Sequence, residues 1–128
     1  MLFSISETKF TKEVLESKIP VLVHFWAPWC GLCRFIVPQL HQFQTDWPEQ
    51  VKVVGINADQ SLKLASTYRL QTLPTLIMFD SGLVLHRLDH FQGREDLKRN
   101  LNEFMITYQA QQHQPVAIPT PEYLTLEA

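Results

Sequence analysis

The chain has 128 residues, of which 45% are hydrophobic and 19% are charged. This length and composition are typical of one soluble globular domain with its own hydrophobic core. The formal net charge is only -2, and basic residues do not gather among aromatic ones, so we expect no nucleic-acid partner.

The first ten residues include Glu7 and Lys9 and lack the apolar run of a signal peptide. No later stretch approaches the ~20 consecutive apolar residues that a membrane-spanning helix needs. We therefore expect no membrane association and a cytoplasmic location.

Residues 2–5 predict a short edge strand, and residues 7–17 predict a short helix because Phe10 and Val14 lie four apart on one helix face. Pro20 ends that helix. Residues 21–26 follow as a nearly continuous apolar run, which is typical of a strand buried on both faces. This segment predicts a central strand.

Residues 31–47 predict an amphipathic helix, with apolar residues at Ile36, Leu40, Phe43 and Trp47. Pro38 removes one backbone donor within this helix and should kink its axis. The junction between the central strand and this helix contains both cysteines of the chain.

Residues 51–57 predict a second buried strand, and residues 60–68 predict a short helix. Alternating strands and helices with short connections favour parallel pairing with right-handed crossovers. Residues 75–79 and 83–88 predict two further strands. Only three residues separate them, too few for a crossover, so an antiparallel hairpin follows. Residues 94–108 predict the last helix. The fold class is therefore α/β with a mixed sheet.

We expect residues 1–109 to form the domain and residues 110–128 to form a tail. The tail is rich in glutamine and proline and lacks helix or strand periodicity, which favours an extended and mobile segment. The alternative is that Tyr123, Leu124 and Leu126 pack on a partner or on the domain.

Cys30 and Cys33 are separated by two residues at the start of a helix. A thiolate is the nucleophile in disulfide exchange, and this spacing lets one sulfur attack while the other resolves the mixed disulfide. The loop between them is too small to stabilise a fold, so the pair is catalytic rather than structural. One such pair supplies only two of the four ligands of a structural zinc site, so we expect no metal.

The sequence Phe25-Trp26-Ala27-Pro28-Trp29-Cys30-Gly31-Leu32-Cys33 resembles the active-site segment of the thioredoxin family. Asp59 after the next strand, Leu73-Pro74-Thr75 before the hairpin and Gly82 in its turn extend the resemblance over about residues 3–106. It implies the thioredoxin fold, with about five strands and about four helices.

The resemblance implies a thiol-disulfide oxidoreductase that exchanges the Cys30–Cys33 disulfide with protein targets. It implies no cofactor beyond this disulfide, a monomer, and a thioredoxin reductase as a candidate electron donor. Cys30 would be the attacking thiolate, with an inert buried thiol as the alternative, and Cys33 the resolving thiol. Arg34 would lower a thiol pKa or serve as a surface charge.

The resemblance also assigns supporting roles. Pro74 would be cis and face the cysteines, whereas a trans proline that starts a strand is the plain alternative. Trp29 would be an exposed contact platform. Trp26 and Asp59 match a family pair in which the carboxylate holds the indole N–H, although Asp59 is equally suited to cap a helix.

Two departures from the family lie behind the cysteines. His24 stands where the family usually has a buried aspartate, and Gly55 stands where it usually has a lysine. That aspartate is thought to help deprotonate the resolving cysteine. His24 should be buried and mostly neutral. It would act as a proton acceptor, or else be a core histidine hydrogen-bonded to backbone.

Two further departures lie beside the cysteines. Leu32 replaces the usual proline between them, which restores a backbone amide and predicts a shifted redox potential. His90 replaces a glycine that lets targets approach closely, and it would narrow the docking groove, pair with the Cys30 thiolate or simply be an exposed loop residue. Two functions remain open. One is a divergent thioredoxin with a restricted target range, and the other is a binding module with little redox activity or with a bound metal.

Overall fold

The structure, a computed structural model, describes residues 3–112. Among these residues five strands form one sheet, in the order β1-β3-β2-β4-β5. The strands β1, β3 and β2 are parallel, whereas β4 is antiparallel to β2 and β5 is antiparallel to β4. The predicted α/β class with a mixed sheet and a terminal hairpin is confirmed. The strand bounds are Phe3–Ser4 (β1), Val21–Trp26 (β2), Lys52–Asn57 (β3), Thr75–Asp80 (β4) and Leu83–Leu88 (β5).

The helical segments follow the predicted order, with two local differences. The predicted helix over residues 7–17 is a 3-10 turn followed by a π-helical segment, in which the N–H of Glu16 donates to the carbonyl of Thr11. Phe10 and Val14 are nevertheless buried, as their spacing predicts. The bounds are Glu7–Lys9 (η1), Thr11–Leu15 (η2), Gly31–Phe35 (α1), Val37–Asp46 (α2), Ala58–Gln60 (η3), Leu62–Thr67 (α3) and Gly93–Gln112 (α4).

The second difference is a break in the predicted helix over residues 31–47. It divides at Ile36 into α1 and α2, and Pro38 lies in the first turn of α2. Proline is well tolerated there because the first helical N–H groups have no intrahelical acceptor. Instead of the predicted kink within one helix, α1 ends and α2 begins at this point.

The hairpin between β4 and β5 turns on Ser81 and Gly82, because Asp80 already pairs with Leu83. Both turn residues have positive φ, at 54° and 81°. A two-residue hairpin loop of this kind needs positive φ at both positions, which glycine adopts without a steric penalty.

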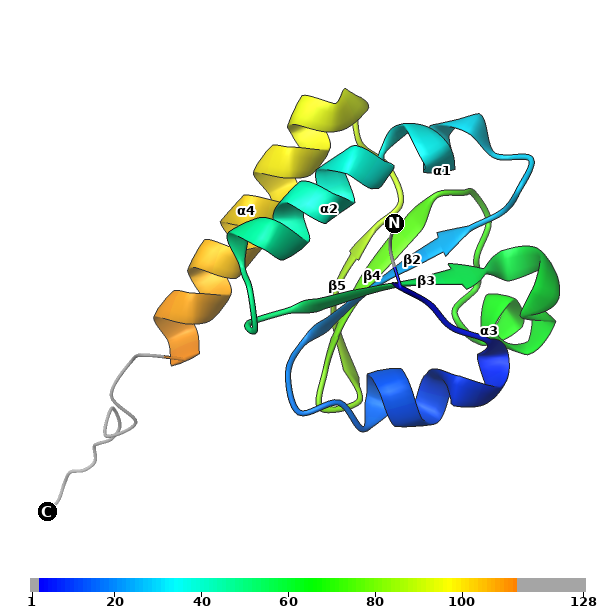
Figure 1. Cartoon of the computed structure of the whole chain (residues 1–128), viewed down its shortest axis with the longest axis horizontal. Helices are drawn as coiled ribbons and strands as arrows, with labels where there is room; N and C mark the ends of the chain where they lie inside the picture. Colours follow the sequence, from blue (N-terminus) through cyan, green and yellow to red (C-terminus); the bar gives the residue numbers. More distant parts are fainter. Residues whose placement is uncertain (1–2, 113–128) are drawn as a thin grey trace, which may run out of the picture. The chain divides into compact units, whose positions relative to one another are not determined.

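The two faces of β2 have different neighbours. Val21, Val23 and Phe25 belong to a buried cluster with Phe10 and Val14 of the N-terminal segment and with residues of β3, α3 and β4. His24 and Trp26 alternate with these residues and lie on the other face. Figure 1 shows α1 and α2 on one side of the sheet and η1, η2 and α3 on the other.

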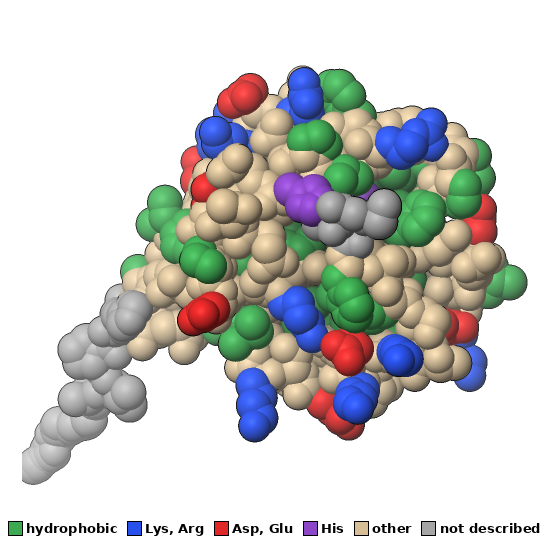
Figure 2. Space-filling model, viewed as in Figure 1, with side chains coloured by type: hydrophobic (Ala, Val, Ile, Leu, Met, Phe, Trp, Pro, Cys, Tyr) green, Lys and Arg blue, Asp and Glu red, His purple; other side chains and the backbone are tan. Residues whose placement is uncertain are grey.

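The predicted last helix is present as α4 and extends beyond residue 108 to Gln112. Contacts divide the chain into two units, with the division between Lys98 and Arg99 inside α4. The predicted tail covers residues 110–128; its first three residues belong to α4, and residues 113–128 lie outside the described residues, so the mobility of that part stays a prediction. None of the described helices combines the length and apolar character that a membrane crossing requires. On the face in Figure 2, acidic and basic side chains are interspersed.

Candidate functional site

Cys30 and Cys33 lie where the chain passes from β2 into α1. Cys30 is the N-cap residue of α1, with extended backbone angles, and Cys33 lies one turn further along the helix. The two sulfurs form a disulfide with a Cα–Cα distance of 5.3 Å, which is within the usual range for such bonds. Both residues are buried, with 5% and 2% of their surfaces exposed.

The Cys30 sulfur accepts a hydrogen bond from the backbone N–H of Cys33 at 3.1 Å. A donor aimed at this sulfur stabilises negative charge on it, which favours the thiolate of Cys30 once the disulfide is reduced. Arg34 extends back along the loop, where its Nη1 donates to the carbonyl of Pro28. The first turn of α1 contains no acidic residue that would oppose a thiolate.

The Leu73–Pro74 peptide bond is cis, as the family resemblance predicts. Leu73 packs against the buried cluster of Ala27, Cys30 and Cys33, which places this loop directly beside the disulfide. Pro74 is buried, and the Thr75 hydroxyl donates to the carbonyl of Thr72 at 2.7 Å. The loop and the cysteine pair therefore form one continuous site.

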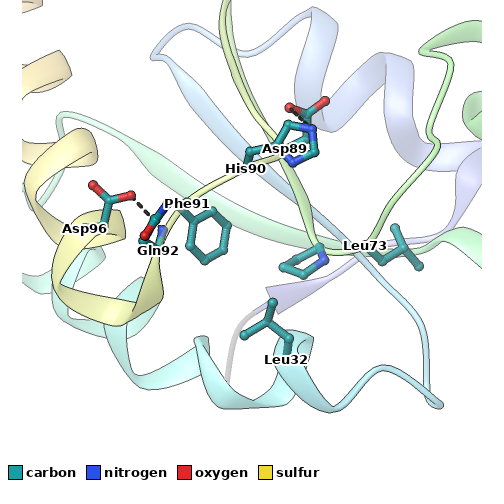
Figure 3. A pocket seen from close by; sticks show the side chains of 8 residues that line it. Leu32, Leu73, Asp89, His90, Phe91, Gln92 and Asp96 are labelled. Atoms are coloured by element: carbon teal, nitrogen blue, oxygen red, sulfur yellow. Dashed lines mark hydrogen bonds and ion pairs between the residues drawn. The ribbon is translucent and has the colours of Figure 1, made fainter.

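A groove of about 590 Å³ lies next to this loop. Figure 3 shows Leu32 reaching into it from α1, opposite Phe91 and Leu73. Asp89 and Asp96 line the same groove, and Asp96 accepts a hydrogen bond from the backbone N–H of Gln92. The groove thus has an apolar floor and acidic residues in its walls. The sequence indicated Leu32, Pro74 and His90, and Leu73 as part of the family segment before the hairpin, but it did not indicate Asp89, Phe91, Gln92 or Asp96.

His90 also lines this groove, and 84% of its side chain is exposed. Its Nε2 lies 3.8 Å from a carboxylate oxygen of Asp89, so Asp89 is the close charged group beside this imidazole. Among the described residues, no hydrogen bond or ion pair joins His90 to Cys30. The structure therefore does not pair His90 with the nucleophile, and an exposed imidazole at the groove is consistent both with a groove-narrowing role and with a plain exposed loop residue.

The tryptophan that contacts Asp59 is not the expected one. The indole Nε1 of Trp29 donates to a carboxylate oxygen of Asp59 at 3.0 Å, so the predicted pairing of Asp59 with Trp26 is wrong. Trp26 continues the face of β2 that includes His24, and its indole lies against Gly55 instead. Trp29 remains 69% exposed, as predicted for a contact platform.

The alternative role of Asp59 as a helix cap is also not observed. Asn57 is the N-cap residue of η3, and its side chain accepts a hydrogen bond from the N–H of Asp59. Asp59 therefore orients Trp29 and belongs to the rim of the site.

His24 is buried, with 2% of its surface exposed, and pairs in register with Gly55 of β3. Burial lowers the pKa of His24 from 6.5 to about 4, so the imidazole is neutral near pH 7. Its Nε2 has no hydrogen-bond partner among the described residues. The expected backbone hydrogen bond is therefore not made by this nitrogen.

A second cavity, of about 400 Å³, lies behind the disulfide and is lined by His24, Trp26, Cys33 and Gly55. Ser4 and Arg34 also line it, as do Val37 and His41 of α2, neither of which the sequence indicated. Their spacing could have indicated them, because in the single helix predicted over residues 31–47 Cys33, Val37 and His41 follow one another at intervals of four and would share one face. Among residues 3–112, no three or more His, Cys, Asp or Glu side chains gather as a metal site would require.

The comparisons with known proteins agree with this geometry. The sequence model of the thioredoxin family matches residues 1–106. Thioredoxin 1 of Synechococcus elongatus is 46% identical over 79 residues, which cover 62% of this chain and 74% of that protein. The thioredoxin of Porphyra purpurea is 36% identical over 104 residues, covering 79% of this chain and 94% of that protein. Thioredoxin M4, chloroplastic, of Arabidopsis thaliana is 37% identical over 103 residues, covering 80% of this chain and 53% of that protein.

Proposed function

This chain is a thiol-disulfide oxidoreductase of the thioredoxin family, and we propose that it reduces disulfides in a restricted set of partner proteins. The observation that carries the proposal is the hydrogen bond from the Cys33 N–H to the Cys30 sulfur at the start of α1. It distinguishes the two sulfurs, because within residues 3–112 a backbone donor that stabilises a thiolate reaches the sulfur of Cys30 and not that of Cys33.

The reaction proceeds in two exchanges from the dithiol form. The Cys30 thiolate attacks one sulfur of the target disulfide, a mixed disulfide forms, and the other target sulfur leaves as a thiolate that takes up a proton. Cys33 then loses its proton and attacks the Cys30 sulfur. The Cys30–Cys33 disulfide forms, and the second target sulfur is released. Two electrons have passed from the protein to the target.

His24 is a candidate to accept the proton of Cys33, because both residues line the same cavity, as does His41. With its pKa lowered to about 4, however, the imidazole is a weak base for a thiol whose ordinary pKa is near 8.5. The transfer is uphill by roughly 6 kcal/mol. His24 therefore supports the resolving step less well than a buried carboxylate, whose pKa is raised by burial.

The target would bind in the groove beside Pro74. Leu32, Leu73 and Phe91 offer apolar contacts to an extended segment next to the target disulfide. The exposed imidazole of His90 takes space at the rim, which supports a narrower range of targets. We further propose that a thioredoxin reductase returns electrons to the disulfide, that the protein acts as a monomer, and that it does so in the cytoplasm.

A disulfide-reduction assay tests this function. With insulin as the protein disulfide, the wild type should accelerate reduction by dithiothreitol and by a thioredoxin reductase with NADPH, and Cys30→Ser should abolish both. His24→Asp should increase turnover, because a buried carboxylate accepts the Cys33 proton more readily. A wild type and a His24→Asp variant that are both inert would favour the alternative, a binding module with little redox activity.

A further inference from the structure

The groove beside Pro74 is bounded by two separate connections of the chain. The connection from α3 to β4, residues 68–74, contributes Leu73 and Pro74 to its lining. The connection from β5 to α4, residues 89–92, contributes all four of its residues. Figure 3 shows Phe91 and Leu73 apart from each other across the groove. The width of the groove therefore depends on what holds these two connections relative to each other.

Arg87, near the end of β5, reaches back to the first connection. Its Nη1 donates to the backbone carbonyl of Tyr68, and its Nη2 donates to the backbone carbonyl of Arg69 at 3.0 Å. These two residues directly follow α3, and Arg69 has a positive φ of 52°. The carbonyls at the end of a helix have no intrahelical donor. The half-buried Arg87 side chain supplies one to each of them.

The same guanidinium also binds the second connection. Its Nε donates to a carboxylate oxygen of Asp89 at 3.2 Å. The side chains of Arg87 and Asp89 are about one-third exposed, and an isolated ion pair with this exposure contributes little to stability. The geometry matters more than the charge here. Because the donors of a guanidinium are fixed in one plane, a group that binds three acceptors also sets their relative positions.

The sheet alone does not fix the first connection. Pairing of β4 with β5 holds one end of each connection, because Leu76 and Leu88 are partners in register. The α3 end of the first connection lies outside this pairing, and Arg87 holds it. Further along this connection, Leu73 packs against the buried cluster that contains both cysteines. In the second connection, Phe91 lines the groove. A shift at either contact of the guanidinium would therefore move a wall of the groove.

We propose that Arg87 is a positioning residue for target binding, whose guanidinium holds the two connections at the spacing that an extended target segment requires. This role rests on the proposed function, because the spacing matters to catalysis only if targets bind in this groove. A preformed groove needs less ordering when a target binds. Loss of the guanidinium should therefore weaken target binding rather than slow the exchange between sulfurs.

Amide hydrogen exchange tests the positioning without any target. In the oxidised full-length protein, the N–H groups of Leu70 and Gln92 report on the two connections, because each donates a hydrogen bond in the structure. Arg87→Met should speed the exchange of both amides about tenfold. Lys52→Met removes the cation of another ion pair of similar exposure, the one with Glu13, and should change neither amide.

Insulin reduction with dithiothreitol as reductant tests the consequence for targets. Arg87→Met should raise the KM for insulin about tenfold and change kcat little, because the groove and not the cysteine pair is altered. Lys52→Met should change neither constant. Arg87→Lys keeps the charge but loses the fixed fork of donors, so it should show the same rise in KM and in amide exchange to a smaller degree.

Unchanged exchange of the Leu70 and Gln92 amides in Arg87→Met, or faster exchange of only one, would overturn the proposal. An unchanged KM in a variant of an active wild type would also overturn it. Equal effects of Arg87→Met and Lys52→Met would show a general loss of stability instead of positioning. If Arg87→Met does not fold, unchanged exchange in Arg87→Lys has the same meaning. If the wild type does not reduce insulin, the proposed function fails, and amide exchange still decides whether Arg87 positions the two connections.

Discussion

At the scale of single residues, His24 has the least ordinary environment in the site. It lies on a central strand with 2% of its surface exposed, and its Nε2 has no partner among the described residues. The folded protein therefore resists protonation of this imidazole, whereas the unfolded chain accepts a proton at the ordinary pKa of 6.5. This difference links the stability of the fold to pH.

The sign of that link follows from the lowered pKa. Between pH 6.5 and about 4 the unfolded state binds the proton and the folded state does not, so the free energy of unfolding decreases as the pH falls. The loss contributed by His24 is about 3 kcal/mol at pH 4 relative to pH 7.5. Urea unfolding of the wild type and of His24→Leu measures it. The difference in free energy of unfolding between the wild type and His24→Leu should change by about 3 kcal/mol from pH 7.5 to pH 4. A difference that stays constant over this range would show that His24 does not link stability to pH.

At the scale of elements, the start of α3 is held by a distant side chain. Ser61 is the N-cap residue but makes no side-chain capping bond. A carboxylate oxygen of Glu7 instead accepts the backbone N–H of Leu64 at 2.8 Å. A carboxylate at this end also interacts favourably with the helix dipole. This hydrogen bond connects the N-terminal segment, through Glu7, to α3, the helix that precedes the Pro74 loop.

Replacing Glu7 should reveal this contact. Glu7→Ala leaves the N–H of Leu64 without its acceptor and should lower the free energy of unfolding by about 1 kcal/mol, as other lost caps do. Glu7→Gln keeps an acceptor oxygen, so it should lower the free energy of unfolding less than Glu7→Ala does. Glu16→Ala, at an exposed position in the same region, is the matched control. Equal effects of the Glu7→Ala and Glu16→Ala substitutions in urea unfolding would show that the cap adds nothing.

At the scale of the whole molecule, His90 should affect large and small substrates differently. Its exposed imidazole lies at the rim of the groove, where a folded target must approach but a small molecule need not. His90→Gly should increase the rate of exchange with a protein disulfide several-fold and change the rate with a small aromatic disulfide little. Equal acceleration of both substrates would indicate an effect on Cys30 itself.

The sequence predicted the fold in most of its parts because the deciding signals are local. The apolar run of β2, the apolar stripe of the following helix and the three-residue separation of the hairpin strands each fix an element by itself. The active-site segment likewise indicated Cys30, Cys33 and Pro74. The predicted elements that differ from the structure do so in local backbone geometry, as in the π-helical segment at Thr11–Leu15.

Contacts between distant side chains were harder to predict. Trp26 and Trp29 are three residues apart, and the indole of Trp29 is the one that reaches Asp59. The cavity behind the disulfide depends on the position of α2 over β2 and on the missing side chain of Gly55. Packing between elements sets these distances, and hydrophobic periodicity contains no information about them.

The central claim is that Cys30 attacks and Cys33 resolves. Trapping the mixed disulfide tests it most directly. The single variants Cys33→Ser and Cys30→Ser are each reduced and incubated with a disulfide-containing protein. Covalent adducts are then separated without reducing agent. The account predicts that Cys33→Ser accumulates an adduct through Cys30, because its resolving thiol is missing. Cys30→Ser should form little adduct. Equal adducts from both variants, or adducts through Cys33 alone, would contradict the assignment.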